Sequence, residues 1–238
     1  MKEDRQDLTT GSIWGKMLFF SIPLMLTNLL QVLFNMADIA VIGQFAGALP
    51  LGAVGSTTTL VTLFTGVLIG MAGGINVLVA RYFGARDKTS TVHTIHTALL
   101  VSLITGIIVL AFGMIFSKGI LEIMNTKEEL LNGAVLYIRI YFLGMPALAL
   151  YNFGNAVCSA FGDTKKPLYY LSAAGVVNVV LNLFFVIVCK MDVAGVATAS
   201  IISQYLSAFL ILRALAKMGG QVNVAQALGR GRRDEAGY

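Results

Sequence analysis

The sequence has little charge for its length. Charged side chains make up 12% of the 238 residues, 57% are hydrophobic and the mean hydropathy is +0.80, whereas an ordinary soluble domain carries about 25% charged residues. A chain with this composition cannot bury its apolar surface in a globule of its own size. The composition therefore excludes a typical soluble domain and predicts a membrane protein, with lipid as part of its solvent.

The sequence also lacks the patterns of a metal site, a disulfide framework or a catalytic set. Its two cysteines, Cys158 and Cys189, both lie in apolar runs and lack metal-site spacing. His93 and His96 are three residues apart, but no third ligand accompanies them. The net charge of +5 is better explained by loop Lys and Arg residues than by nucleic-acid binding. We therefore expect no enzyme activity, no cofactor and no nucleic-acid partner.

Long apolar runs predict the fold class. A helix needs about 20 mainly apolar residues to cross the hydrocarbon core, and runs of this kind occur at Met17–Ile42, Leu51–Ala80, Thr97–Phe116, Gly133–Phe161, Leu168–Cys189 and Val193–Leu212. Ser90 or Thr91 is the expected N-cap of the third helix. We predict an all-α membrane protein whose six-transmembrane-helix bundle covers residues 13–217. Residues 1–12 form an N-terminal cytoplasmic segment, and the polar residues 218–238 a disordered or aberrant tail.

The basic residues predict the orientation of the six spans. All of the 17 Lys and Arg residues fall on the side of the two termini, except Lys118, Lys127, Arg139 and Lys190. Cytoplasmic loops carry the excess of Lys and Arg in membrane proteins. The chain is therefore expected to be multi-pass in the cell (plasma or inner) membrane with both termini in the cytoplasm.

Polar residues form a stripe on the first span. On a helical wheel they fall within about 100° of arc, and Asp38 lies near the outer end of the stripe, which comprises Thr27, Asn28, Gln31, Asn35 and Asp38. The fifth span carries Asn178 and Asn182 on one face, and the sixth carries Thr198, Ser200, Ser203 and Gln204. Amides and hydroxyls of this kind can instead join helices to each other. Asp38 is the only acid well inside a span, which suits ion coupling or cation binding better than acid–base catalysis.

Four stretches together resemble the N-terminal half of a transporter of the multidrug and toxin extrusion (MATE) family. They are "SIPLMLTNLLQVLFNMADIAVIGQFAG", "GMAGGINVLVARYFGARD", "AFGDTKKPL", and "VVNVVLNLFFV" followed by "GVATASIISQ". The resemblance implies one of two six-helix lobes around a central cavity, with Na⁺ or H⁺ entry driving export of organic, often cationic, compounds. A second six-helix lobe would then be a partner, beside the organic cation and membrane lipid.

The resemblance also implies roles for particular residues. Asp38 would couple the ion, with Gln31, Asn35, Asn178, Asn182 and Ser200 lining the same cavity. If Na⁺ is the ion, Asp38 and Asn178 would be among its ligands. Some relatives place an acid where this chain has Asn182, which leaves a single carboxylate here and keeps the identity of the ion open.

Other functions stay open at this point. The family fold has twelve helices and six are predicted here, which favours a truncated or frame-shifted product over a half-transporter that pairs with another lobe. An inactive or regulatory membrane fragment is a further alternative. A flippase of lipid-linked oligosaccharides would be expected to have a basic cavity, and the spans offer only Arg139 near an outer end.

Overall fold

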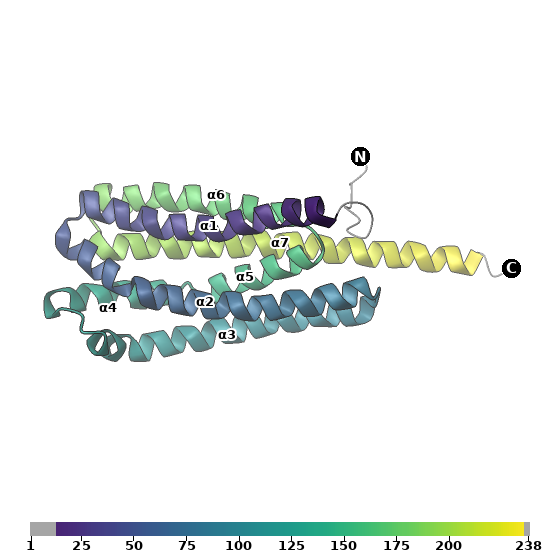
Figure 1. Cartoon of the computed structure of the whole chain (residues 1–238), viewed down its shortest axis with the longest axis horizontal. Helices are drawn as coiled ribbons and strands as arrows, with labels where there is room; N and C mark the ends of the chain where they lie inside the picture. Colours follow the sequence, from purple (N-terminus) through teal and green to yellow (C-terminus); the bar gives the residue numbers. More distant parts are fainter. Residues whose placement is uncertain (1–12, 236–238) are drawn as a thin grey trace.

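The protein is a bundle of long helices whose axes run almost parallel (Figure 1). The computed structural model describes the backbone of residues 13–235 and the side chains of residues 21–218, and this part contains helices and no strand. The elements are α1 (Ile13–Phe45), α2 (Ala48–Gly84), α3 (Lys88–Ile123), α4 (Glu128–Phe142), α5 (Met145–Ala160), α6 (Lys165–Leu183), the π-helix η1 (Phe184–Val188) and α7 (Asp192–Glu235).

The helices confirm the predicted membrane fold. Within the described residues, five helical stretches are long and apolar enough to cross a bilayer, namely Ser21–Phe45, Ala48–Gly84, Lys88–Ile123, Lys165–Val188 and Asp192–Met218. Helices α4 and α5 together supply a sixth crossing if they are counted as one span. The two helices meet at an angle of 49°. Large apolar side chains remain exposed along these helices, as expected of a protein solvated by lipid.

The fourth span is broken, although its sequence predicted one continuous helix from Gly133 to Phe161. The break falls at Leu143 and Gly144, immediately before Pro146 in the first turn of α5. A proline lacks the backbone N–H and its ring clashes with the carbonyl four residues earlier, so the helix cannot continue unchanged. Helix α7 contacts this break, because the Tyr205 hydroxyl donates to the carbonyl oxygen of Leu143 at 3.1 Å.

Two further details differ from the sequence prediction. The N-cap of α3 is Asp87, whose carboxylate accepts from the backbone N–H of Ser90 at 3.0 Å and from its hydroxyl at 2.6 Å; neither Ser90 nor Thr91 is the cap. At the other end of the chain, the backbone of residues 218–235 continues α7 as a helix rather than as the disordered tail expected from its composition. The division of the chain into three segments stays a prediction.

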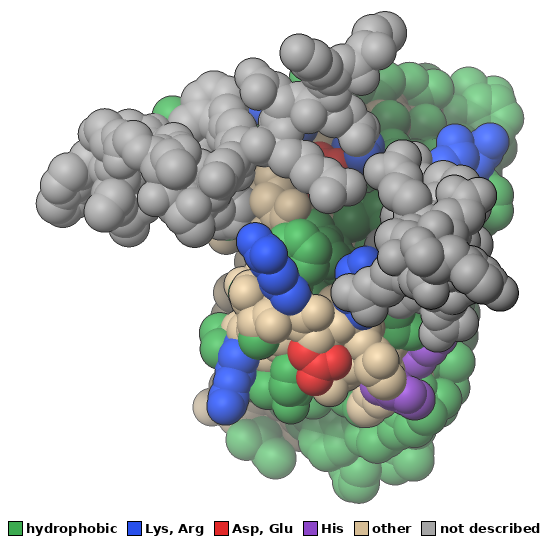
Figure 2. Space-filling view, turned by 90° about the vertical axis from the view of Figure 1, so that its right-hand side faces the viewer, with side chains coloured by type: hydrophobic (Ala, Val, Ile, Leu, Met, Phe, Trp, Pro, Cys, Tyr) green, Lys and Arg blue, Asp and Glu red, His purple; other side chains and the backbone are tan. Residues whose placement is uncertain are grey.

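The broken span occupies the middle of the bundle. Helices α2 and α3 pack on one side of α5, α7 packs on another, and α1 and α6 complete the side formed with α7 (Figure 1). The α2–α3 and α5–α6 connections lie at the same end as the beginning of α1 and the C-terminal part of α7. Figure 2 looks onto this end, where Lys, Arg and His side chains gather. The α5 residues Ala147, Tyr151 and Phe153 are almost completely buried, so α5 forms the centre of the packed core.

Close contact between α3 and α5 depends on Gly106. A methyl group at this position would lie 2.5 Å from the Cα atom of Pro146, which is backbone and cannot rotate away. Gly66, also within a long helix, has no heavy atom of the described residues within 4 Å of the equivalent point. The two glycines therefore have the same chemistry but different packing.

We predict that Gly106→Ala lowers the free energy of unfolding by about 1–3 kcal/mol, because overpacking forces the helices apart. Gly66→Ala is the matched control and should be neutral or stabilising by roughly 0.5–1 kcal/mol, since alanine favours the helix. Thermal unfolding of both purified variants in detergent measures the difference. Equal melting temperatures for the two variants would contradict the packing shown for Gly106.

Candidate functional site

The carboxylate of Asp38 is buried where α1, α6 and α7 meet. Its side chain is only 3% exposed. One carboxylate oxygen, Oδ1, accepts from Nδ2 of Asn182 at 2.6 Å, and the other, Oδ2, accepts from the Ser200 hydroxyl at 2.7 Å. A buried charge is costly unless it is paired or hydrogen-bonded. These two short hydrogen bonds therefore supply the stabilisation that water gives an exposed carboxylate.

Asn178 joins the two donors of Asp38 into one network. Its Nδ2 donates to the Ser200 hydroxyl oxygen at 3.4 Å, while its Oδ1 accepts from Nδ2 of Asn182 at 3.3 Å. Asn178, Asn182 and Ser200 are all buried. The amide oxygen Oδ1 of Asn182 is buried and has no hydrogen-bond partner among the described residues. The cluster thus holds one acid, several neutral oxygens and one unused acceptor.

Local sequence explains why α1 and α6 approach closely enough to build this network. Asn178 and Asn182 are four residues apart, so they share one face of α6. One turn earlier on that helix stands Gly175, against which the ring of Phe34 lies; a methyl group at Gly175 would overlap the ring. The missing side chain lets α1 rest on α6 and brings Asp38 next to Asn182.

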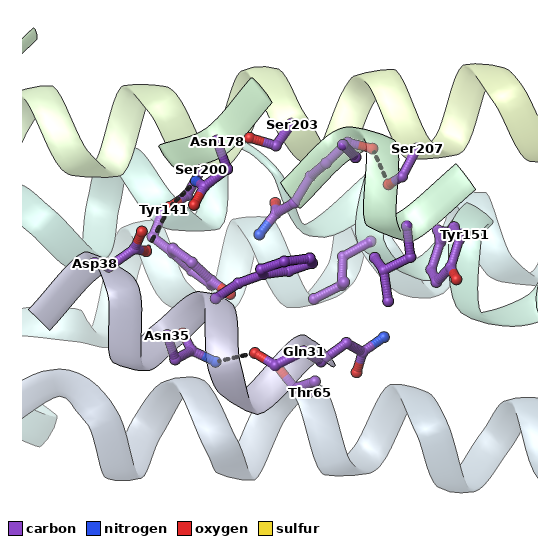
Figure 3. Close-up of a pocket in the computed structure, with 15 residues that line it drawn as sticks. Gln31, Asn35, Asp38, Thr65, Tyr141, Tyr151, Asn178, Ser200, Ser203 and Ser207 are labelled. Atoms are coloured by element: carbon purple, nitrogen blue, oxygen red, sulfur yellow. Dashed lines mark hydrogen bonds between the residues drawn. The ribbon is translucent and has the colours of Figure 1, made fainter. Parts of the chain in front are cut away.

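A pocket leads away from the Asp38 cluster between the helices. Its cavity volume is about 70 Å³, and its lining extends from Asp38 at one end to Tyr151 at the other (Figure 3). Its walls are formed by Gln31, Phe34, Asn35, Asp38, Thr65, Tyr141, Leu148, Tyr151, Leu171, Ala174, Asn178, Ser200, Ser203, Gln204 and Ser207. Among these lining residues, Asp38 is the only Asp, Glu, Lys, Arg or His.

The structure brings most of the predicted site residues together. Five of the six line the pocket, namely Gln31, Asn35, Asp38, Asn178 and Ser200. Asn182 is outside the lining set but bonds directly to Asp38. Asn35 donates to the backbone carbonyl of Gln31 at 3.2 Å, and the Gln31 amide donates to Oδ1 of Asn152 at 3.4 Å. The roles assigned to these residues stay predictions.

The polar stripe on α1 does not face the pocket along its whole length. Thr27 is buried and its hydroxyl donates to the carbonyl oxygen of Pro23, whereas Asn28 is exposed. Neither belongs to the pocket lining. The site therefore begins at Gln31, the first residue of the stripe that lines the pocket.

Sequence reasoning missed several residues of the pocket wall. Tyr141 from α4, Thr65 from α2 and Tyr151 from α5 all contribute. A periodic signal was available on α7, where Ser200, Ser203, Gln204 and Ser207 recur every three or four residues. On α2, α4 and α5 the sequence does not distinguish the pocket-lining side chains from other polar residues of the same helix, so only packing identifies them.

Comparison with known proteins identifies the family. A family model described as MatE matches residues 23–184. The chain belongs to the MatE family. This result confirms the resemblance seen in the motifs. Members of the family are integral membrane transporters rather than enzymes, so the chain is an integral membrane protein.

Two Bacillus subtilis proteins are similar to this MatE chain over most of its length. "Probable multidrug resistance protein YpnP" is 34% identical over 198 residues, which is 83% of this chain and 44% of that protein. "Probable multidrug resistance protein YoeA" is 29% identical over 211 residues, 87% of this chain and 45% of that protein. The chain thus spans about half the length of the curated relatives it matches.

A solved structure agrees with the fold of the MatE chain. The "Crystal structure of MATE in the bent conformation" superposes with a TM-score of 0.82 at 25% identity, covering 89% of this chain and 47% of that one. The matched part is consistent with the N-terminal half of the fold.

We predict that Ser200→Ala lowers the free energy of unfolding by about 1–3 kcal/mol, because a buried carboxylate loses one of its two donors. Ser203→Ala is the matched control on the same helix and in the same pocket. Its hydroxyl bonds only to the carbonyl of Ala199 within its own helix, so its loss should change stability little. Chemical unfolding in detergent measures both.

A double-mutant cycle checks the origin of this effect. In an Asp38→Asn background, Ser200→Ala should cost clearly less than in the original chain, since the charged acceptor is gone and neighbouring residues couple. An unchanged cost would show that Ser200 stabilises the lobe independently of Asp38.

Proposed function

We propose that the chain is the N-terminal lobe of a secondary multidrug efflux transporter that exchanges an inward-moving cation, Na⁺ or H⁺, for an organic, often cationic, compound. The observation that carries this proposal is a single buried carboxylate, Asp38, held by neutral donors at the end of an accessible pocket. The multidrug resistance relatives support the same assignment. The proposal extends to the whole transporter, of which this chain corresponds to about half.

Exchange follows from the electrostatics of one carboxylate. A buried charge without a counter-ion is costly, so Asp38 favours any cation that can reach it. The pocket allows a proton, a metal ion or an organic cation to approach the same two oxygens. Because one carboxylate neutralises one positive charge, binding of the coupling ion displaces the substrate. A ligand that binds two conformations unequally shifts their populations, which would link the exchange to alternating access.

The cluster is chemically suited to either coupling ion. A proton needs only an oxygen of Asp38. A hard cation such as Na⁺ prefers several oxygen ligands, and Asp38, Asn178 and Ser200 offer a carboxylate, an amide oxygen and a hydroxyl. The amide oxygen of Asn182, which has no hydrogen-bond partner among the described residues, adds a fourth oxygen in the same cluster. The proposal therefore includes both H⁺ and Na⁺, because these oxygens can bind either one.

We further propose that the lobe lies in the cell membrane with both termini in the cytoplasm. Five described Lys and Arg residues lie at or beside the α2–α3 and α5–α6 connections, at the end of the bundle from which α1 starts (Figure 1): Arg81, Arg86, Lys88, Lys165 and Lys166. Such enrichment marks the cytoplasmic side. A second six-helix lobe would complete the central cavity.

We predict that Asp38→Asn abolishes cation-dependent dye binding. In the original chain, purified in detergent, ethidium binding followed by fluorescence anisotropy should weaken as the concentration of H⁺ or of Na⁺ rises, because both compete for one carboxylate. Asp38→Asn should lower ethidium affinity by about tenfold or more, since the lost charge pair is worth more than about 1.4 kcal/mol. Asp192→Asn, an exposed acid at the start of α7, is the matched control and should bind as the original chain does.

Two results would overturn the proposal. Ethidium binding that stays constant at every pH and Na⁺ concentration would rule out exchange at a shared site. Binding that survives Asp38→Asn unchanged would show that Asp38 is not the site.

A further inference from the structure

We infer that a small cavity between α1, α2 and α4 is a binding site for one ordered water molecule, which accepts a hydrogen bond from the Tyr137 hydroxyl and donates one to Asn35. This cavity is separate from the pocket at Asp38, and the inference is independent of the proposed function. It follows from the size of the cavity and from the hydrogen-bonding groups of the side chains that surround it.

The cavity has the size and the lining that a single buried water requires. Its volume is about 10 Å³, which is about the space that one water molecule occupies. Four of its lining residues carry polar groups, namely Asn35, Thr57, Thr58 and Tyr137, and the others are aliphatic. The lining contains no charged side chain, so it does not offer the counter-charge that a buried ion needs.

The buried hydroxyl of Tyr137 needs a hydrogen-bond partner. The residue is only 2% exposed, and within the described part of the chain its hydroxyl forms no hydrogen bond. Its ring stacks on that of Tyr141, one turn along α4, with 5.8 Å between the ring centroids. Buried tyrosine hydroxyls ordinarily have a partner. Because Tyr137 lines the cavity, a water molecule there supplies the acceptor.

Two other lining residues offer acceptors to the same water. The Thr57 hydroxyl donates to a backbone carbonyl of its own helix at 2.7 Å, which uses its one proton and leaves its oxygen able to accept. Asn35 donates through Nδ2 to the carbonyl oxygen of Gln31 at 3.2 Å, and its Oδ1 has no partner among the described residues. A water that accepts from Tyr137 can therefore donate to both, which gives the three hydrogen bonds typical of a buried water.

The water also explains how Asn35 is oriented beside Asp38. Asn35 lines both this cavity and the pocket, and its amide bonds back to Gln31 rather than to Asp38 (Figure 3). An amide oxygen turned toward the carboxylate would be repelled by it. A hydrogen bond from the water to Oδ1 of Asn35 therefore keeps this oxygen in the small cavity and away from Asp38.

A high-resolution crystal structure of the purified full chain tests the site directly. We predict one solvent peak about 2.7–3.2 Å from the Tyr137 hydroxyl oxygen and from Oδ1 of Asn35, and the loss of this peak in Tyr137→Phe. Tyr141→Phe is the matched control, because Tyr141 lies on the same helix but lines the other pocket; this variant should keep the peak. A direct hydrogen bond from Tyr137 to a protein group would overturn the inference, as would a map that shows other buried waters but none here.

A double-mutant cycle gives an independent measurement in detergent solution. Tyr137→Phe and Thr57→Val each remove one partner of the water and nearly keep the shape of the side chain. Each should lower the melting temperature by about 2–4 °C. A water that has lost one partner is held less firmly by the others, so the double variant should lose clearly less than the sum of the single losses. In a control cycle of Tyr141→Phe with Thr57→Val, the losses should add.

The control cycle separates the water from ordinary packing between α2 and α4. Additive losses in both cycles would overturn the inference, because Tyr137 and Thr57 would then act independently. Equal departures from additivity in both cycles would also overturn it, since packing of the two helices would explain the coupling without a water. If a variant does not fold, the solvent peak in the original chain still tests the site.

Discussion

The buried carboxylate of Asp38 is the constraint on which the arrangement of the lobe depends. Its two short hydrogen bonds come from different helices, Asn182 on α6 and Ser200 on α7. Bonds of 2.6 and 2.7 Å tolerate little displacement, so α1, α6 and α7 must keep a fixed register around this point. The close contact of Phe34 with Gly175 serves the same requirement, because it brings α1 onto α6 one to two turns away.

The break between α4 and α5 shapes the pocket beside Asp38. A straight helix from α4 through α5 would follow a different path past α7, whereas the 49° bend lets Tyr141 and Tyr151 line the same pocket from two directions. The freed carbonyl of Leu143 finds a donor in Tyr205 of α7, as an interrupted helix in a membrane requires. Helix α7 therefore contributes to both features: its Ser200 donates a hydrogen bond to Asp38, and its Tyr205 donates one to the break that shapes the pocket.

The proposed exchange needs only one carboxylate in an otherwise neutral pocket. Asp38 would neutralise one cation at a time, and no second titratable group would be required. In that proposal the side chains around Asp38 would supply hydrogen-bond donors to the free carboxylate and oxygen ligands to a bound cation.

Sequence alone determined the membrane class, the number of spans and the acid at the centre of the site. These follow from local composition and periodicity: the apolar runs, and the spacing of Gln31, Asn35 and Asp38 on one helical face. The sequence could not show that Gln31 lines the pocket while Asn28 does not, because a helical wheel shows which way a side chain points but not whether another helix packs against it. Only the tertiary structure decided that α6 and α7 cover Asp38 and that Thr65 and Tyr141 join the pocket. Those features depend on contacts between residues far apart in the chain, which no local pattern encodes.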